Sequence, residues 1–461
     1  MSSVPEPSDH LRSAPGVGRR EFLVGAGAAA VTGWAVAGIV GAPVQAGPRF
    51  ARADEFDADV PTAWFDLALD LVRTAAGYSP PVASRAFGYT GVALYEALVP
   101  GMEGCRSLAG LLAGLRRPPT AGRNTAYHWP TVANAALAAI LRHLFPTAPA
   151  DRRSAIDTLE NTFADRYRPG LPRGVFGRSV RRGQDVAAAI FDWSTMDGGH
   201  EGYLRNFPPY DPPAGPGRWE PTPPALLPAL QPQWGTNRCL AIPAGAACPP
   251  GDHPPYSEDP GSAFHAEAIE VYEAVNNLTA EQEAIARFWS DDPGSTPTPP
   301  GHSISITTQT LRHEGASLAV AAEAYAKVGI AVCDAFIACW YQKYVYNLLR
   351  PVTYIRRHIH PDWAPLLVTP PFPEYTSGHS VQSAAALQVL TNLFGDSHAF
   401  VDHTHDDRGL APRPFGSFLE AADEAAISRL YGGIHFNAAI INGVTQGRCI
   451  GHHVSALPLR S

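Results

Sequence analysis

Apolar residues recur at intervals of three and four along most of this chain, the spacing that gives an α-helix one buried face. The pattern predicts helices in five segments of the N-terminal part, at residues 61–98, 129–145, 156–163, 180–193 and 263–289. Sustained alternation of apolar and polar residues, which half-buried strands require, is scarce. The sequence therefore predicts an all-α fold and, more finely, two packed four-helix bundles.

A segment dense in Pro and Gly interrupts the helical pattern between about residues 198 and 261, and a second such loop covers residues 291–302. These segments predict long irregular connections. Aromatic side chains in the first, Trp219, Trp234 and Tyr256, are suited to anchor it on the helices. We expect one helical domain over residues 47–461, with a motif-bearing core at 314–455.

The first residues have the pattern of an export signal. Arg19 and Arg20 precede an apolar run rich in Ala and Gly, and Val44-Gln45-Ala46 resembles a cleavage site. A membrane anchor is the alternative. We expect residues 1–46 to be a twin-arginine signal peptide and the mature chain to be periplasmic or secreted, without a membrane span.

Composition and charge argue against some classes of binding partner. The chain has 461 residues, 45% of them hydrophobic, and a formal net charge of −8. Because surfaces that bind nucleic acid are basic, this charge argues against such a partner. Six cysteines include no Cys-x-x-Cys pair, so a zinc site is not indicated. Cys239 and Cys248 flank a loop and are candidates to pair after export, but the sequence does not decide whether they do.

Two cations open the C-terminal motif region. Lys343 and Arg350 are seven residues apart, so one helix would present both on nearly the same face, with Pro351 ending that helix after Arg350. The intervening residues are aromatic or apolar and include no acid. Cations in so apolar a segment predict an anionic partner from elsewhere.

Two further segments carry histidines. Ser377-Gly378-His379 precedes a strong helix-forming run, which places Ser377 at the helix start, where backbone N–H groups bind anions. Arg429 ends another helical pattern, and the glycines after it let the chain turn toward His435. Each segment alone is explained by an ordinary helix cap or a core histidine. Together, within fewer than a hundred residues, they predict a site for a tetrahedral oxyanion.

The region from about residue 314 to 453 resembles the vanadium-dependent haloperoxidases and the related type 2 phosphatidic acid and bacterial acid phosphatases. Their shared pattern is Lys-x6-Arg-Pro, then Pro-Ser-Gly-His, then Ser-Arg-x5-His-x3-Asp. The resemblance implies an oxyanion held by five residues, a histidine that binds vanadium or attacks phosphorus, and an acid–base histidine. These are Lys343, Arg350, Ser377, Gly378 and Arg429 for the oxyanion, His435 for the metal or the nucleophile, and His379 for proton transfer.

Two aromatic residues favour the haloperoxidase branch. Trp340 and Phe372 fall where fungal vanadium chloroperoxidase carries aromatics beside its halide, although core packing explains them equally well. Thr376 replaces the usual proline, and Ala439 replaces the aspartate that orients the metal-binding histidine. Asn437, Asn442 or an acid of the loop at residues 402–407 are candidates to take its place. That loop, with its acidic residues and histidines, is otherwise expected to be solvated.

The resemblance thus implies halide oxidation by hydrogen peroxide at a vanadate cofactor, with Lys343 polarising the bound oxidant and His379 moving the proton. Bromide is expected over chloride because it is easier to oxidise, and a small organic molecule would accept the halogen. The alternative is an acid phosphatase that works through a phosphohistidine and needs no cofactor. A third reading is an exported oxyanion-binding protein. The oligomeric state stays open, a dimer included.

Overall fold

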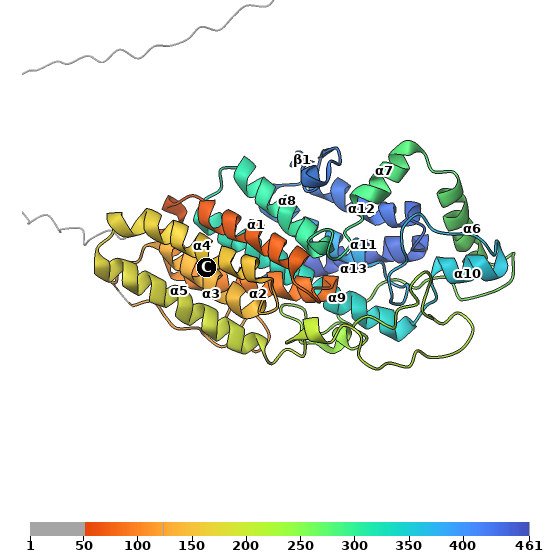
Figure 1. Cartoon of the computed structure of the whole chain (residues 1–461), viewed down its shortest axis with the longest axis horizontal. Coiled ribbons are helices and arrows are strands. Elements are labelled where there is room, and N and C mark those ends of the chain that lie inside the picture. The colour runs from red at the N-terminus through yellow and green to blue at the C-terminus, as the bar shows by residue number, and fades with distance from the viewer. Residues whose placement is uncertain (1–50, 123, 461) are drawn as a thin grey trace, which may run out of the picture. The chain divides into compact units, whose positions relative to one another are not determined.

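The computed structural model describes residues 51–122 and 124–460, which contain thirteen α-helices and one two-stranded antiparallel sheet (Figure 1). The sheet pairs β1 (Phe400–Asp402) with β2 (Arg413–Phe415). The predicted all-α fold is confirmed. The expected signal peptide lies outside the described residues. Within the described part, no helix combines the length and apolar character needed to cross a membrane.

Five helices form the N-terminal group, in which α3 packs against α4 and α5, and α2 contacts both α3 and α5. Prolines begin two of them: Pro80 and Pro81 open α2, and Pro130 lies in the first turn of α3, where a missing N–H costs nothing. The group comprises α1 (Asp59–Thr74), α2 (Pro80–Leu98), α3 (Trp129–Leu144), α4 (Ala150–Tyr167) and α5 (Arg173–Ser194).

The C-terminal group carries the motifs. Its core is α8, α9, α11, α12 and α13, and α11 packs against each of the other four. The bounds are α6 (Ala263–Asn276), α7 (Ala280–Phe288), α8 (Thr298–His313), α9 (Leu318–Tyr346), α10 (Pro351–His358), α11 (Gly378–Phe394), α12 (Phe418–Tyr431) and α13 (Asn437–Ser455). Short 3-10 turns lie at Ala53–Glu55, Val99–Gly101, Arg168–Gly170, Gly202–Leu204, Trp234–Thr236 and Asp406–Arg408.

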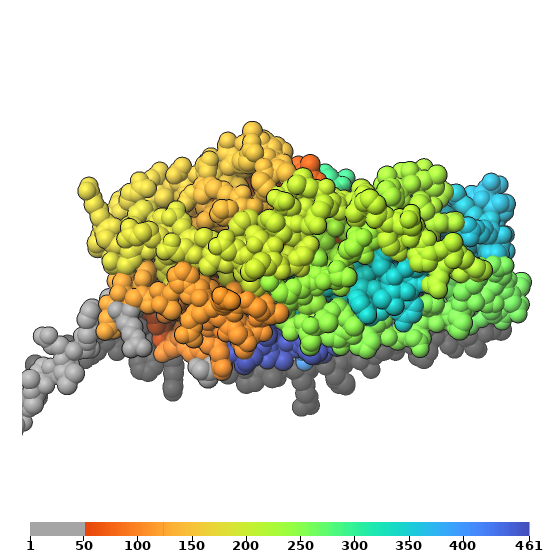
Figure 2. Space-filling model, turned by 90° about the horizontal axis from the view of Figure 1, so that it is seen from below, coloured from red at the N-terminus to blue at the C-terminus, as the bar shows by residue number. Residues whose placement is uncertain are grey.

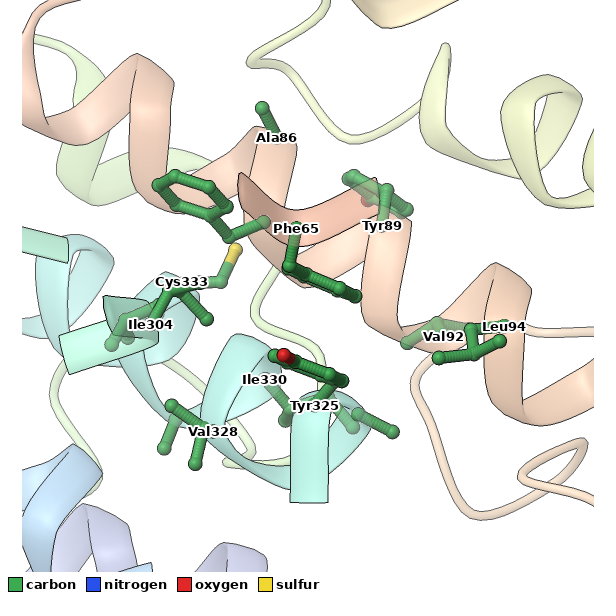
Figure 3. Packing of buried hydrophobic residues seen from close by; sticks show 14 of the residues in the cluster. Phe65, Ala86, Tyr89, Val92, Leu94, Ile304, Tyr325, Val328, Ile330 and Cys333 are labelled. Carbon is green, nitrogen blue, oxygen red and sulfur yellow. The ribbon is translucent and has the colours of Figure 1, made fainter. Parts of the chain in front are cut away.

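The long helix α9 belongs to both groups, because it packs against α2 on one side and α11 on another. Its side chains are buried almost all the way round. Tyr325 of α9 stacks on Phe65 of α1 with ring centroids 3.7 Å apart (Figure 3). At Gly91 of α2, a Cβ atom would lie 2.3 Å from the Tyr325 carbonyl oxygen, so glycine permits the close approach of α2 to α9.

The Pro/Gly-rich segment at residues 195–262 is irregular, as predicted, and covers part of one face of the molecule (Figure 2). Trp219 and Trp234 anchor it, with 2% and 3% of their surfaces exposed. Asp334 of α9 also holds it, accepting hydrogen bonds from three successive backbone N–H groups, those of Leu240, Ala241 and Ile242. Because the segment is fixed to α9, it can form a wall of the candidate site.

The candidate disulfide between Cys239 and Cys248 is not formed. Cys248 is bonded to Cys449 of α13, with Cα atoms 6.0 Å apart, and Cys239 is a free, buried thiol. Closeness in sequence does not decide such a pairing, because the fold must place the two Cα atoms close together with their Cβ atoms pointing toward each other.

Candidate active site

The three cations of the motifs are buried at one place, although they come from three elements. Lys343 lies in the last turn of α9, Arg350 precedes α10, and Arg429 lies in the last turn of α12. At most 2% of each residue is exposed. The expectation that Lys343 and Arg350 share a helix face is wrong. Asn347 takes a left-handed conformation (φ 47°) that ends α9, and Pro351 begins the next helix instead of ending this one.

Backbone carbonyls hold these cations in position. The Lys343 ammonium donates to the carbonyls of Pro373 (3.0 Å), Glu374 (2.9 Å) and Thr376 (2.5 Å). In the same way, Arg350 donates to the carbonyls of Phe372 and Ile434, each at 2.8 Å. Among the described residues, no carboxylate forms an ion pair with either side chain.

Arg429 is held in a similar manner. It donates to the carbonyl of Trp289 at 2.8 Å and to the Ser428 hydroxyl at 2.9 Å, and it too forms no ion pair with a described carboxylate. The three buried positive charges are therefore positioned by neutral groups, and the nearby carboxylates Glu374, Asp291 and Asp292 act on them only from beyond ion-pair distance.

Burial acts against these charges. It lowers the pKa of Lys343 to about 7 and the pKa values of Arg350 and Arg429 to about 10. Desolvation of a cation is unfavourable, and a bound anion offsets that cost. The electrostatics therefore favour a negatively charged ligand among the three side chains.

The predicted helix start at Ser377 is confirmed, because α11 begins there. Ser377 is its N-cap, and the Ser377 hydroxyl accepts a hydrogen bond from the Ser380 N–H at 3.3 Å. Gly378 lines the adjoining cavity, and a Cβ atom there would point toward the Trp340 ring, 3.8 Å away. The absence of a side chain thus leaves the helix amides open to a ligand.

His435 is fixed by a residue that the sequence did not single out. Its Nδ1 lies 2.8 Å from Oε1 of Glu374, and the Phe436 N–H donates to the same oxygen at 3.0 Å. On the other side of the ring, Nε2 lies 3.2 Å from a donor nitrogen of Arg350. A proton on Nδ1, donated to Glu374, leaves the Nε2 lone pair facing the cations.

Glu374 thus takes the place of the aspartate that is Ala439 in this chain. The three candidates named from sequence do not fill this role. Asn437 donates to Glu270, Asn442 donates to the carbonyl of Asp252, and Asp402 binds His302. Burial raises the pKa of Glu374 to about 7, against the lowering influence of Arg350 and Lys343.

His379 also lines the cavity, and one of its ring nitrogens is unengaged. Its Nε2 has no hydrogen-bond partner among the described residues. Burial, and then the charge of Arg429, hold the pKa of His379 well below its usual range. The neutral imidazole that results is able to accept a proton.

Trp340 and Phe372 lie side by side at the same cavity, with ring centroids 4.8 Å apart. The Lys343 ammonium is 5.0 Å from the Phe372 centroid, and the Arg350 guanidinium is 4.8 Å from it. Positive ring edges and adjacent cations suit a small anion. The cavity has a volume of about 350 Å³, and Arg429, His379 and His435 also line it. Lys343, Arg350 and Ser377 lie behind this lining.

A buried charge network adjoins the cavity, which its member Asp291 also lines. His302 of α8 places Nδ1 2.9 Å from Asp291 and Nε2 2.7 Å from Asp402, and His405 Nε2 lies 3.2 Å from the other Asp291 oxygen. Burial by itself would lower the pKa of His302, but the two carboxylates outweigh it and raise that pKa to about 10. A protonated His302 therefore donates to both acids.

This network corrects the expectation of a solvated loop at residues 402–407. Asp402 and His405 are buried, whereas His403, Asp406 and Asp407 are exposed as expected. The ligand atoms of Asp291, His302 and His405 lie within 4.8 Å of one another, close enough to hold a metal ion, but two-fold donation by His302 already accounts for this arrangement. The network is also linked to Arg429 through Trp289. The Trp289 carbonyl accepts a hydrogen bond from Arg429, and the Trp289 ring stacks on His302 with centroids 4.3 Å apart.

The chain is similar to known proteins over most of its length. Residues 323–460 match the family described as the VCPO second helical-bundle domain. The structure of the first bacterial vanadium-dependent iodoperoxidase is similar with 38% identity and a TM-score of 0.79, over 87% of this chain and 96% of that one.

Two further structures share the fold. Bacterial vanadium-dependent chloroperoxidase in its holo form matches with 18% identity and a TM-score of 0.63, over 84% of this chain and 93% of that one. Its apo form matches with 17% identity and the same TM-score, over 83% and 94%. A comparison with curated proteins gives no match. This chain is 38% identical to the iodoperoxidase over 96% of that protein, and this shows that it belongs to the vanadium-dependent haloperoxidases and is an oxidoreductase.

Proposed function

We propose that this protein is a vanadate-dependent haloperoxidase that uses hydrogen peroxide to oxidise a halide to hypohalous acid. One observation carries the proposal: three buried cations without a carboxylate in ion-pair distance surround His435, whose Nε2 faces the nearest of them, Arg350, at 3.2 Å. A phosphate-shaped oxyanion such as vanadate supplies the negative charge that this cluster lacks. Membership of the family supports the same conclusion.

The residues fit vanadate in charge and in donor chemistry. Arg350 and Arg429 would donate hydrogen bonds to its oxygens, together with the Ser377 hydroxyl and the Gly378 N–H. Lys343, whose three N–H groups are held by backbone carbonyls, would add its positive charge. His435 would bind vanadium through Nε2, since Nδ1 is committed to Glu374. When bound, vanadate supplies a Lewis acid that activates hydrogen peroxide toward attack by halide.

The protein's own part in the chemistry is to move protons and to orient reactants. His379, neutral at rest, would accept a proton from hydrogen peroxide as the peroxide binds. Lys343 would place its positive charge beside the oxygen that the halide attacks. Trp340 and Phe372 would receive the halide on their ring edges, near both cations. Excluding bulk water strengthens each of these interactions.

We propose bromide as the halide in preference to chloride, because bromide is easier to oxidise. Iodide is easier still, and the 38% identical relative is described as an iodoperoxidase. We also propose that residues 1–46 direct export by the twin-arginine route. The Cys248–Cys449 disulfide supports this, since such bonds form in oxidising compartments outside the cytosol.

The test uses purified protein freed of vanadate and assayed with and without added orthovanadate. One assay follows bromination of a dimedone-type acceptor with peroxide and bromide, and another follows hydrolysis of an aryl phosphate. We expect bromination that depends on vanadate and is abolished in His435→Ala but kept in His452→Ala, which removes an exposed histidine. Phosphate hydrolysis inhibited by vanadate, without bromination, would instead assign the protein to the phosphatase branch.

A further inference from the structure

The cavity at the active site is much larger than its inorganic reactants need. Its volume is about 350 Å³, whereas a molecule of water size occupies about 30 Å³. Sites for small organic molecules begin at about 300 Å³. Halide and peroxide therefore leave room for an organic molecule of one or two rings.

The walls beyond the oxyanion site are apolar. Two loops supply most of them, one at residues 222–230 and the other at 367–372. Leu227 and Val368, one from each loop, line the cavity and are 43% and 70% exposed. Large apolar side chains held toward solvent in this way mark contact surfaces for apolar partners.

The charges along the cavity select against an anionic molecule. Among its described lining residues, Arg429 is the single arginine or lysine, and it belongs to the oxyanion site. The lining also includes Asp292, an exposed residue whose carboxylate accepts a hydrogen bond from the Ser290 hydroxyl at 3.0 Å. The other acidic lining residue, Asp291, is buried and paired with His302. The outer wall thus offers no cation to an acidic ligand, and the exposed Asp292 carboxylate repels it.

We propose that this cavity binds an uncharged, apolar, electron-rich organic molecule and that the molecule is halogenated there, before hypohalous acid escapes to solvent. The inference rests on the proposed function. Halide, hydrogen peroxide and a proton give hypohalous acid and water. A carbon of the acceptor then attacks the halogen, the halogen–oxygen bond breaks, and the departing hydroxide takes the carbon's proton as water.

A competition between two acceptors tests the proposal. Naphthol and a naphthol sulfonate share the reactive ring, but the sulfonate adds a charge. Their product ratio is measured with the vanadate-loaded protein, bromide and peroxide, and again with hypobromous acid as a reagent. We expect the protein to shift the ratio toward naphthol by about tenfold or more, the effect of burying a modest apolar surface.

The outcomes separate the inference from the function on which it rests. Vanadate-dependent oxidation of iodide to triiodide needs no organic acceptor. If iodide is oxidised but the naphthol ratio equals that of the reagent, the acid acts in free solution and the inference fails alone. If neither reaction occurs, the proposed function fails and the inference fails with it.

Two variants test whether the cavity wall causes the preference for naphthol. Leu227→Glu adds a charge at the cavity, and Val320→Glu is the control, because Val320 is similarly exposed (38%) but lies in the first turn of α9, outside the cavity lining. We expect Leu227→Glu to reduce the preference for naphthol several-fold while triiodide formation stays within about twofold of the wild type. Val320→Glu should change neither value. A folded Leu227→Glu protein with the wild-type ratio would overturn the proposal.

Discussion

At the scale of single residues, the position of one carboxylate distinguishes this site from the pattern of its family. Ala439 occupies the usual aspartate position, and Glu374 reaches His435 from another segment, the loop before α11. The two positions are neighbours, because the Ser377 N–H, three residues after Glu374, donates to the Ala439 carbonyl at 3.1 Å. The carboxylate next to the histidine thus comes from the loop before α11, which contacts the segment that carries the aspartate in the family pattern.

Replacing Glu374 should weaken vanadate binding. In Glu374→Gln the neutral amide no longer draws the proton to Nδ1 of His435, so Nε2 becomes a poorer ligand. We expect affinity for orthovanadate to fall by about 10–100-fold, measured by titrating vanadate-free protein and following bromination. Asn437→Ala is the control, since Asn437 is half-buried and donates to Glu270, away from His435. Glu374→Ala combined with Ala439→Asp should recover part of the lost affinity; unchanged affinity in Glu374→Gln would contradict the role.

The titration of Lys343 predicts how vanadate binding depends on pH. Its pKa is lowered to about 7, so the unliganded site loses this positive charge as pH rises above that value. A bound anion favours the charged ammonium, so binding takes up a proton above pH 7. Affinity should then fall by up to about tenfold per pH unit. Calorimetric titration in buffers of different ionisation enthalpy measures the number of protons taken up when vanadate binds. The same titration of Lys343→Gln measures the part that comes from protonation of vanadate itself. Equal pH slopes in both proteins would refute the assignment.

Residue types and order were enough to predict the cations and histidines of the site, because these chemical groups recur in a fixed sequence of motifs. The same information could not identify Glu374 as a partner of His435. The two residues are sixty-one positions apart, and only the folded chain brings their side chains to 2.8 Å. The pairing of Asp291 with His302 could not be predicted for the same reason, since one lies in a Pro/Gly loop and the other inside a helix.

At the scale of secondary-structure elements, Pro351 is an ambiguous signal. Proline both ends helices and begins them, because its missing N–H is harmless in the first turn. The deciding residue is Asn347, whose left-handed backbone ends α9 four residues earlier. Arg350 therefore approaches His435 from its own segment, independently of Lys343, and this gives the anion site donors from two directions.

The network around His302 ties three elements together, and breaking it should destabilise the fold. In His302→Gln the acids Asp291 and Asp402 lose the cation between them, so we expect the free energy of unfolding to fall by about 3–5 kcal/mol near pH 6.5. His302 has a raised pKa, so its contribution is complete below the unfolded value of 6.5 and is lost as pH approaches 10. The difference between variant and wild type should shrink accordingly.

Denaturant unfolding across this pH range measures that difference. His403→Gln is the matched control, because His403 pairs with Asp406 on the exposed surface and its loss should cost at most about 1 kcal/mol. A destabilisation by His302→Gln that stays constant from pH 6.5 to 10 would show that shape, and not charge, is the contribution of His302.

At the scale of the whole molecule, the candidate site is closed by segments far apart in the chain. Helix α13 packs against α11, whose N-terminus forms part of the anion site, and the long segment at residues 195–262 supplies a cavity wall. At Gly447, a Cβ atom would lie 2.2 Å from the Val381 carbonyl oxygen, so glycine allows α13 and α11 to approach closely. The Cys248–Cys449 bond then joins that long segment to α13, across 201 residues of sequence.

Removing this disulfide should lower stability without altering the chemistry of the site. Cys248→Ser with Cys449→Ser frees a long loop in the unfolded chain, and we expect the free energy of unfolding to fall by about 2–5 kcal/mol. Vanadate-dependent activity should persist at low temperature, since neither cysteine lines the cavity, but heat should inactivate the variant sooner. Cys105→Ser, which removes a free and half-buried thiol, is the control. Wild-type protein treated with a reductant should unfold like the double variant. If instead both unfold at the wild-type temperature, packing of the segment through Trp219, Trp234 and Asp334 is sufficient to hold the cavity wall in place.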